Sequence, residues 1–177
     1  MKKLLYTILF TLVLSGGASA NEEYSKWLTG LDLPKPIFQD NEFYMGVTYT
    51  GKPGKLSEIS QILFSFIYEE EYSDDKRYLT RSGCKPRDCG TKGMLWIDLK
   101  QKVAIGAIYH SFWEKLDFSK PRVKQIFLFS NFYEDQNELP NEFIKSYSKW
   151  VSKIEEQPEK FRFLNSNNKL TEIKTIK

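Results

Sequence analysis

The sequence predicts a single domain in which amphipathic helices pack on a central antiparallel β-sheet. A chain of 177 residues, 41% of them hydrophobic, suits one domain with a sizeable buried core. Successive strand candidates between residues 78 and 130 are joined by short turns, which favours antiparallel pairing. Residues 139–154 carry an apolar face at helical spacing, and we expect that face to lie on the sheet.

The first 20 residues have the pattern of a secretory signal peptide. Lys2 and Lys3 precede an apolar run over residues 4–14, and Ala18-Ser19-Ala20 forms a cleavage site of small residues. The alternative, a membrane anchor, is disfavoured because a span needs about 20 apolar residues. We therefore expect a mature chain of residues 21–177 that is periplasmic or secreted and not embedded in a membrane.

The charge of the mature chain argues against nucleic acid as a partner. Cleavage removes two of the 26 basic residues and none of the 23 acidic ones, so the formal charge falls from +3 to +1. A nucleic-acid-binding face needs clustered basic residues, which this near-neutral chain does not suggest.

The first third of the mature chain predicts one helix. Prolines within residues 33–36 exclude a helix there, and residues 43–50 favour an extended segment. Apolar residues at spacings of three and four over residues 56–67 predict an amphipathic helix, with a partly extended segment as the alternative. The acidic run over residues 69–75 is expected to be a solvated loop.

The next segment predicts strands. Residues 94–99 and 103–110 are rich in β-formers and flank a short polar turn, which predicts a hairpin. Within it Met94, Trp96 and Ile97 are expected to be buried. Residues 78–81 and 124–130 are further strand candidates.

The C-terminal part predicts the second helix and then a tail. Pro140 suits the first turn of a helix over residues 139–154. Phe161 and Phe163 alternate and are expected to close the core. The polar residues 165–177 are expected to form a loose tail of the same domain.

Catalysis, metals and cofactors find no support in the residues. A zinc site needs about four ligands, and the chain holds two Cys and one His. A nucleophilic pair of Cys with His110 would need a free thiol in an oxidising compartment, and the four-residue spacing of the cysteines differs from that of thiol oxidoreductases. His110 is more simply a sheet or surface residue. We therefore expect a protein that is not an enzyme and has no cofactor.

The four tryptophans allow an alternative function. Trp96 and Trp150 fall on expected core faces, so packing explains them. An exposed Trp113 could stack on sugar. This supports a second hypothesis, a periplasmic module that binds cell-wall sugar or an envelope partner.

The stretch from Ser82 to Gly90 holds both cysteines. In an exported protein two cysteines usually pair, which would close a short charged loop. Closing so short a loop stabilises the fold little but fixes local shape, and Pro86 stiffens it further. Lys85 and Arg87 could then enter an acidic cleft, with the Arg87 guanidinium as a bidentate donor. From the residues alone, a rigid turn without a binding function is about as well supported as a binding loop.

The same stretch resembles the Ivy family, the inhibitors of vertebrate (C-type) lysozyme. The family pattern is Cys-Lys-Pro-His-Asp-Cys-Gly in a strand-loop-hairpin context. This chain matches it, with Arg87 at the histidine position, in the run Tyr78-x-x-x-Ser82-Gly83-Cys84-Lys85-Pro86-Arg87-Asp88-Cys89-Gly90, followed by Trp96 and Gly106. Weaker likeness over residues 30–34 and 154–161 extends it to most of the mature chain.

The resemblance implies a fold, a partner and a site. The fold would be α+β, a central antiparallel β-sheet with helices packed on it, and often a homodimer. A disulfide between Cys84 and Cys89 would hold a loop that plugs the lysozyme active site. The implied inhibitory residues are Cys84, Lys85, Pro86, Arg87, Asp88, Cys89 and Gly90. A lysozyme of another type or a bacterial lytic enzyme is the alternative target.

Overall fold

The strands that the structure describes form one mixed sheet. The computed structural model describes residues 68–85, 88–113, 117–130, 132–167 and 169–176. The expected signal peptide and the helix expected over residues 56–67 lie outside these residues. The described elements are β1 (Tyr68–Tyr72), β2 (Tyr78–Lys85), β3 (Asp88–Asp98), β4 (Val103–Phe112), β5 (Val123–Ser130), the 3-10 turn η2 (Gln136–Glu138), α5 (Asn141–Val151), β6 (Lys160–Leu164) and β7 (Leu170–Ile173).

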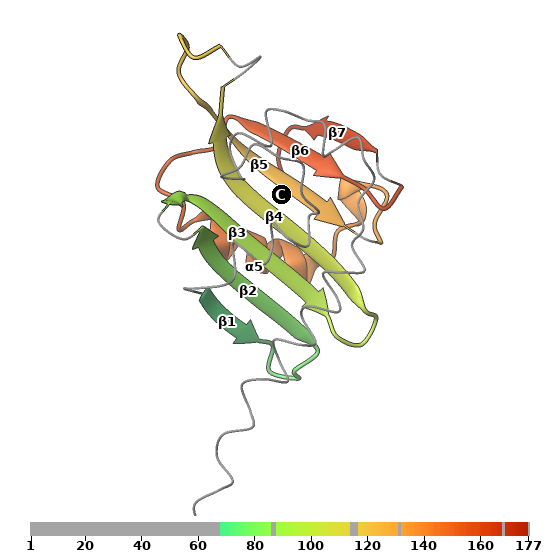
Figure 1. Ribbon diagram of the computed structural model, residues 1–177. Coiled ribbons are helices and arrows are strands. Elements are labelled where there is room, and N and C mark those ends of the chain that lie inside the picture. Colours follow the sequence, from blue (N-terminus) through green and yellow to red (C-terminus); the bar gives the residue numbers. More distant parts are fainter. Residues whose placement is uncertain (1–67, 86–87, 114–116, 131, 168, 177) are drawn as a thin grey trace, which may run out of the picture.

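The seven strands lie side by side in the order of the sequence, from β1 at one edge to β7 at the other (Figure 1). Neighbours pair antiparallel except β5 and β6, which run parallel. A parallel pair needs a crossover connection, and the segment carrying α5 supplies it. The expected α+β fold with a central antiparallel sheet and helices packed on it is therefore wrong. The described region is a mixed, sheet-dominated structure whose one described α-helix is α5.

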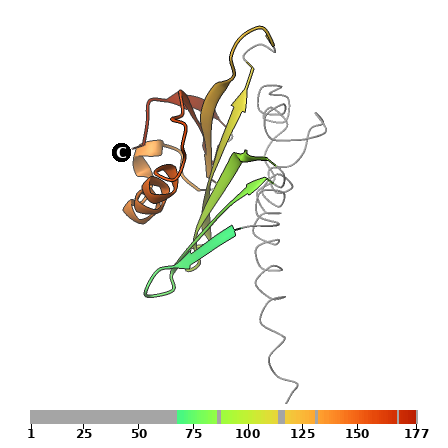
Figure 2. The ribbon, with the colours of Figure 1, turned by 90° about the vertical axis from the view of Figure 1, so that its left-hand side faces the viewer.

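Helix α5 covers one face of the sheet (Figure 2). Its buried residues Phe143, Tyr147 and Trp150 recur at spacings of four and three, which places them on one side of the helix. They join a core that includes Met94 and Trp96 of β3. Tyr78 stacks on Trp96, with ring centroids 5.2 Å apart. The predicted burial of both tryptophans is confirmed. Phe163 lies in the core as expected, whereas Phe161 is partly buried and packs against it.

The central strands are buried on both faces. All residues of β4 except Ser111 are buried, and residues of β3 and β5 that do not face α5, such as Leu95, Ile97 and Phe127, are buried as well. Strands covered on both sides have continuous apolar runs rather than alternation. Gly106 is required here because a Cβ would lie 1.8 Å from a ring atom of Phe129, its neighbour on β5.

Both ends of the sheet differ from the sequence prediction. Residues 69–71, expected in a solvated loop, belong to edge strand β1. The expected loose tail contains β7, which pairs with β6 through four residues and buries Ile173 in the core. Helix α5 is shorter than predicted at both ends: Pro140 is its N-cap rather than a residue of its first turn, and the helix ends at Val151 rather than at residue 154.

Candidate functional site

The two cysteines lie at the connection between β2 and β3. Cys84 and Cys89 form a disulfide with their Cα atoms 4.9 Å apart, which confirms the expected pairing. Cys84 belongs to the end of β2 and Cys89 to the start of β3. The loop closed by this bond is therefore the tip of a hairpin. Its residues 86 and 87, with the side chain of Arg87, lie outside the described residues.

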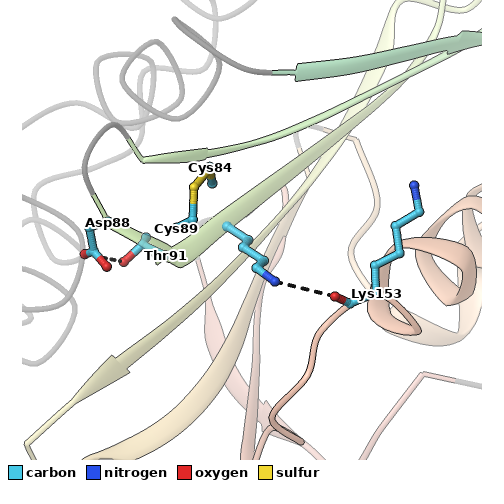
Figure 3. The surroundings of a disulfide bond; sticks show 6 residues. Cys84, Asp88, Cys89, Thr91 and Lys153 are labelled. Atoms are coloured by element: carbon cyan, nitrogen blue, oxygen red, sulfur yellow. Dashed lines mark hydrogen bonds between the residues drawn. A yellow bond between two sulfur atoms is a disulfide. The ribbon is translucent and has the colours of Figure 1, made fainter.

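The hairpin changes register at the disulfide. Cys84 pairs with Lys92, whereas the next residue, Lys85, pairs with Asp88. Three residues of β3 thus stand between two positions that are consecutive on β2. Such a bulge bends the strand and re-aims its side chains. It lets Cys89 turn back and reach Cys84 (Figure 3).

Lys85 does not lie on the outer surface of the loop. Its side chain is buried, with 5% of the residue exposed, and its Nζ lies 3.6 Å from Oδ2 of Asp88. The same carboxylate oxygen accepts a hydrogen bond from Oγ1 of Thr91 at 3.3 Å. The role of Lys85 in binding a partner stays a prediction. In this structure its ammonium lies inside the loop, beside Asp88, and Asp88 in turn contacts Thr91.

The described residues that the loop does expose are few. Cys89 and Gly90 are exposed, and Cys84 and Asp88 are half-buried. A Cβ at Gly90 would lie 3.0 Å from Oδ1 of Asp88. The absence of a side chain at Gly90 therefore leaves room for the Asp88 carboxylate. The described outer surface of the loop is thus made mainly of backbone, disulfide and one carboxylate.

A groove of about 270 Å³ opens beside the disulfide, on the side that carries α5. The Nζ of Lys92 donates a hydrogen bond to the backbone carbonyl of Lys153 at 3.4 Å, which ties β3 to the end of the helix (Figure 3). The side chain of Lys153 forms an ion pair with Glu69 of β1. The groove is lined by Glu69, Ser82, Gly83, Cys84, Cys89, Lys92, Trp150 and Lys153.

The groove is lined by two lysines and one glutamate, and the glutamate is paired with one of the lysines. A hydrogen bond from Lys153 and the charge of its ammonium hold the pKa of Glu69 below its ordinary value. The sequence gives no sign of the groove because β1 and the end of α5 are far apart in the chain.

His110 is a buried residue of the sheet. Its Nε2 lies 2.6 Å from Nε2 of Gln125, and Oε1 of Gln125 accepts a hydrogen bond at 2.9 Å from Nε of Arg162. All three side chains are buried on the face of the sheet opposite α5. Across the described residues, no three His, Cys, Asp or Glu side chains gather as metal ligands would.

Trp113 follows β4 and is half-buried. The guanidinium carbon of Arg122 lies 3.9 Å from the centroid of its ring, and Phe118 contacts it edge-on with centroids 5.0 Å apart. One face of the indole is therefore occupied within the protein. The exposed ring of this pair is that of Phe118.

Comparison with known proteins gives no relative for this chain. No family model, no curated protein and no solved structure matches it. Among the described helices, none is both long enough and apolar enough to cross a membrane.

Proposed function

We propose that this protein is an exported inhibitor of lysozyme, with C-type lysozyme as the preferred target. The observation that carries the proposal is the disulfide-closed loop at the tip of the β2–β3 hairpin. The resemblance of this loop to that of the Ivy family supports the choice of target. The proposed inhibitor performs no chemistry and needs no cofactor.

The strands and side chains that hold the loop suit a rigid loop that blocks an active site. Strand β3 lies inside the sheet, between β2 and β4, and most of its residues from Thr91 to Asp98 are buried. The disulfide and the Lys85–Asp88 ion pair close the loop from two sides. A loop held in one shape loses little conformational entropy when it binds, so more of its contact energy becomes affinity.

The carboxyl groups in the active site of the target are the groups that the loop would recognise. A lysozyme cleaves its substrate with two carboxyl groups, one of them an acid whose pKa is raised in an apolar pocket. The guanidinium of Arg87 can donate two parallel hydrogen bonds to such a carboxylate. Arginine keeps its charge at every physiological pH, so this pairing does not depend on protonation as it would for the family histidine. The loop would also exclude substrate by its bulk.

The test is a titration of lysozyme activity with the mature chain of residues 21–177. Arg87→Ala should weaken inhibition by about 1–3 kcal/mol, which is roughly 5- to 150-fold, because it leaves a buried carboxylate of the enzyme without its partner. Lys145→Ala is the control, because it removes a cation that is exposed on α5.

The panel of targets should contain C-type lysozyme, lysozymes of other types and bacterial lytic enzymes. Absence of inhibition of all of them at micromolar inhibitor would refute the proposal. Homodimerisation, which the resemblance also implies, is a separate prediction that sedimentation of the mature chain decides.

A further inference from the structure

The connection between β4 and β5 leaves the sheet at the same end as the disulfide loop. Strands β3 and β4 run antiparallel, with Lys92 opposite Tyr109, so the start of β3 and the end of β4 lie at one end of the sheet. Val123, the first residue of β5, pairs with Phe112, the last residue of β4. Figures 1 and 2 show the described part of this connection, residues 117–122, projecting beyond the other described loops.

The projecting connection carries an ordered group of three side chains, the Trp113 cluster, formed by Trp113, Phe118 and Arg122. Phe118 is 61% exposed and meets the indole edge-on, at an interplanar angle of 69°. Arg122 stacks on the indole and donates a hydrogen bond from Nη1 to Oγ of Ser111 at 3.5 Å. Stacking of a guanidinium on an aromatic ring is attractive, so the cluster has a defined shape before any partner arrives.

The backbone under Phe118 is also held. Oδ1 of Asp117 accepts hydrogen bonds from the backbone N–H and the hydroxyl of Ser119, at 3.1 and 2.6 Å. The backbone N–H of Lys120 donates to the carbonyl of Asp117 at 3.2 Å, and the two side chains form an ion pair at 3.5 Å. This turn presents the phenyl ring outward and fixes its position.

We propose that the Trp113 cluster is a second contact surface for the enzyme whose cleft receives the disulfide loop. This inference rests on the proposed function. Tryptophan and arginine are over-represented among the residues that dominate protein–protein affinity, and aromatic residues are enriched at such interfaces. Ligand clefts are lined mainly by apolar and aromatic side chains, so the mouth of a cleft offers Phe118 a complementary surface.

Placing both contacts on one sheet has a thermodynamic advantage. Rigid-body entropy is lost once, when the enzyme binds, so a second preformed contact adds to affinity without repeating that cost. Direct binding of a glycan by the cluster is the competing interpretation. It is disfavoured because Arg122 occupies one face of the indole and leaves Phe118 as the main exposed ring.

The experiment compares two phenylalanines of equal exposure in the full mature chain. Phe118→Ser removes the projecting ring, whereas Phe132→Ser is the control. Phe132 is likewise 61% exposed and lies edge-on against Tyr133 at 5.2 Å, but it follows β5 at the opposite end of the sheet. Phe118→Ser should raise the inhibition constant about 10- to 100-fold, mainly through faster dissociation. Phe132→Ser should change it less than about twofold, and both variants should keep the unfolding midpoint of the wild type.

The outcomes distinguish failure of the proposed inhibitory function from failure of the second contact surface. If the wild type inhibits no lytic enzyme, the proposed function fails and this inference fails with it. If the wild type inhibits but Phe118→Ser matches Phe132→Ser, the second surface is refuted while the inhibitor remains. Loss of retention on insoluble peptidoglycan by Phe118→Ser, with unchanged inhibition, would assign the cluster to a glycan and also refute it.

A double variant adds an independent check. Arg87 and Phe118 lie on different loops and should contact different parts of the enzyme, so their effects on the inhibition constant should multiply. A double variant no weaker than Arg87→Ala alone would contradict the second surface.

Discussion

Asp98 organises the turn between β3 and β4. Its Oδ1 accepts hydrogen bonds from the backbone N–H groups of Lys100 and Gln101, both at 2.9 Å. Its Oδ2 accepts two from Arg77, at 2.8 Å from Nη2 and 3.1 Å from Nε. Lys102, at a φ of 60°, completes the turn. One buried carboxylate thus ties the hairpin to the residue that precedes β2.

These bonds have a consequence for stability at acid pH. Burial alone would raise the pKa of Asp98, but the hydrogen bonds from Arg77 and the turn backbone outweigh it and hold the pKa below its usual range. A carboxyl group whose pKa is lowered by folding stabilises the protein above its unfolded pKa of about 3.9. That contribution is lost as the pH falls through the lower, folded value.

We therefore expect Asp98→Asn to reduce the free energy of unfolding by about 1–2 kcal/mol at pH 7. The difference from the wild type should shrink below about pH 4, where the wild-type carboxylate becomes protonated. Urea unfolding between pH 7 and pH 2.5 measures both. Asp135→Asn is the control, since Asp135 is the exposed N-cap of η2 and asparagine caps as well as aspartate. A difference that stays constant down to pH 2.5 would contradict this account of Asp98.

At the scale of elements, two ion pairs join the edge strand β1 to Lys149 of α5 and to Lys153, which lies just after that helix. Glu71 Oε2 lies 2.5 Å from Nζ of Lys149, and Glu69 pairs with Lys153 in the same way. Glutamates two apart on a strand point to the same side, which is the side of the helix. Both pairs are exposed, so each contributes only about 0–1 kcal/mol and salt screens it.

The double variant Glu69→Gln/Glu71→Gln should therefore loosen β1 without unfolding the protein. Hydrogen exchange of the β1 amides should quicken by roughly 2- to 30-fold at low salt, while the global unfolding midpoint moves little. About 1 M NaCl should bring the wild type to the level of the variant. Glu172→Gln on the opposite edge strand β7 is the control and should leave the β1 amides unchanged. Equal protection in the wild type and the double variant would show that the ion pairs do not hold the strand.

Elements with an apolar pattern of their own can be predicted from the sequence, whereas elements held by residues distant in the chain cannot. The hairpin over residues 94–110 and helix α5 have apolar patterns that their own burial requires, and both are found. The three glutamates of β1 form no apolar pattern from which a strand could be predicted. Glu71 is paired with Lys149 of α5 and Glu69 with Lys153 just after it, about 80 residues later in the chain. The parallel pairing of β5 with β6 depends on where the segment carrying α5 returns to the sheet, which local propensity does not specify.

For the whole molecule, the position of the candidate site can be predicted but its surface cannot. The spacing of Cys84 and Cys89 and the glycines around them indicate a tight closed loop. The register shift beside Cys84, which accompanies the buried position of Lys85, leaves no trace in composition. A change in strand register moves side chains from one face to the other, so surface and interior positions follow only from the pairing.

The disulfide should serve the binding surface more than the fold, and the double variant Cys84→Ser/Cys89→Ser separates the two. The two cysteines are only five positions apart in the sequence, so the loop that the bond closes is short. Removal of the bond should therefore lower the free energy of unfolding by at most about 2 kcal/mol. The sheet around it stays paired through seven further residue pairs between β2 and β3. The variant should therefore keep its circular dichroism spectrum and a cooperative urea transition.

Inhibition should respond far more strongly than stability. Without the bond, the loop must lose its conformational freedom on binding, so the inhibition constant should rise at least about tenfold. Reduction of the wild-type protein should reproduce the weakened inhibition, whereas the double variant should be insensitive to reductant. A variant that fails to fold would show that the disulfide is required for the stability of the sheet and would contradict this prediction. A folded variant with unchanged inhibition would show that the other contacts of the loop, among them those of Asp88 with Lys85 and Thr91, hold its binding shape without the disulfide.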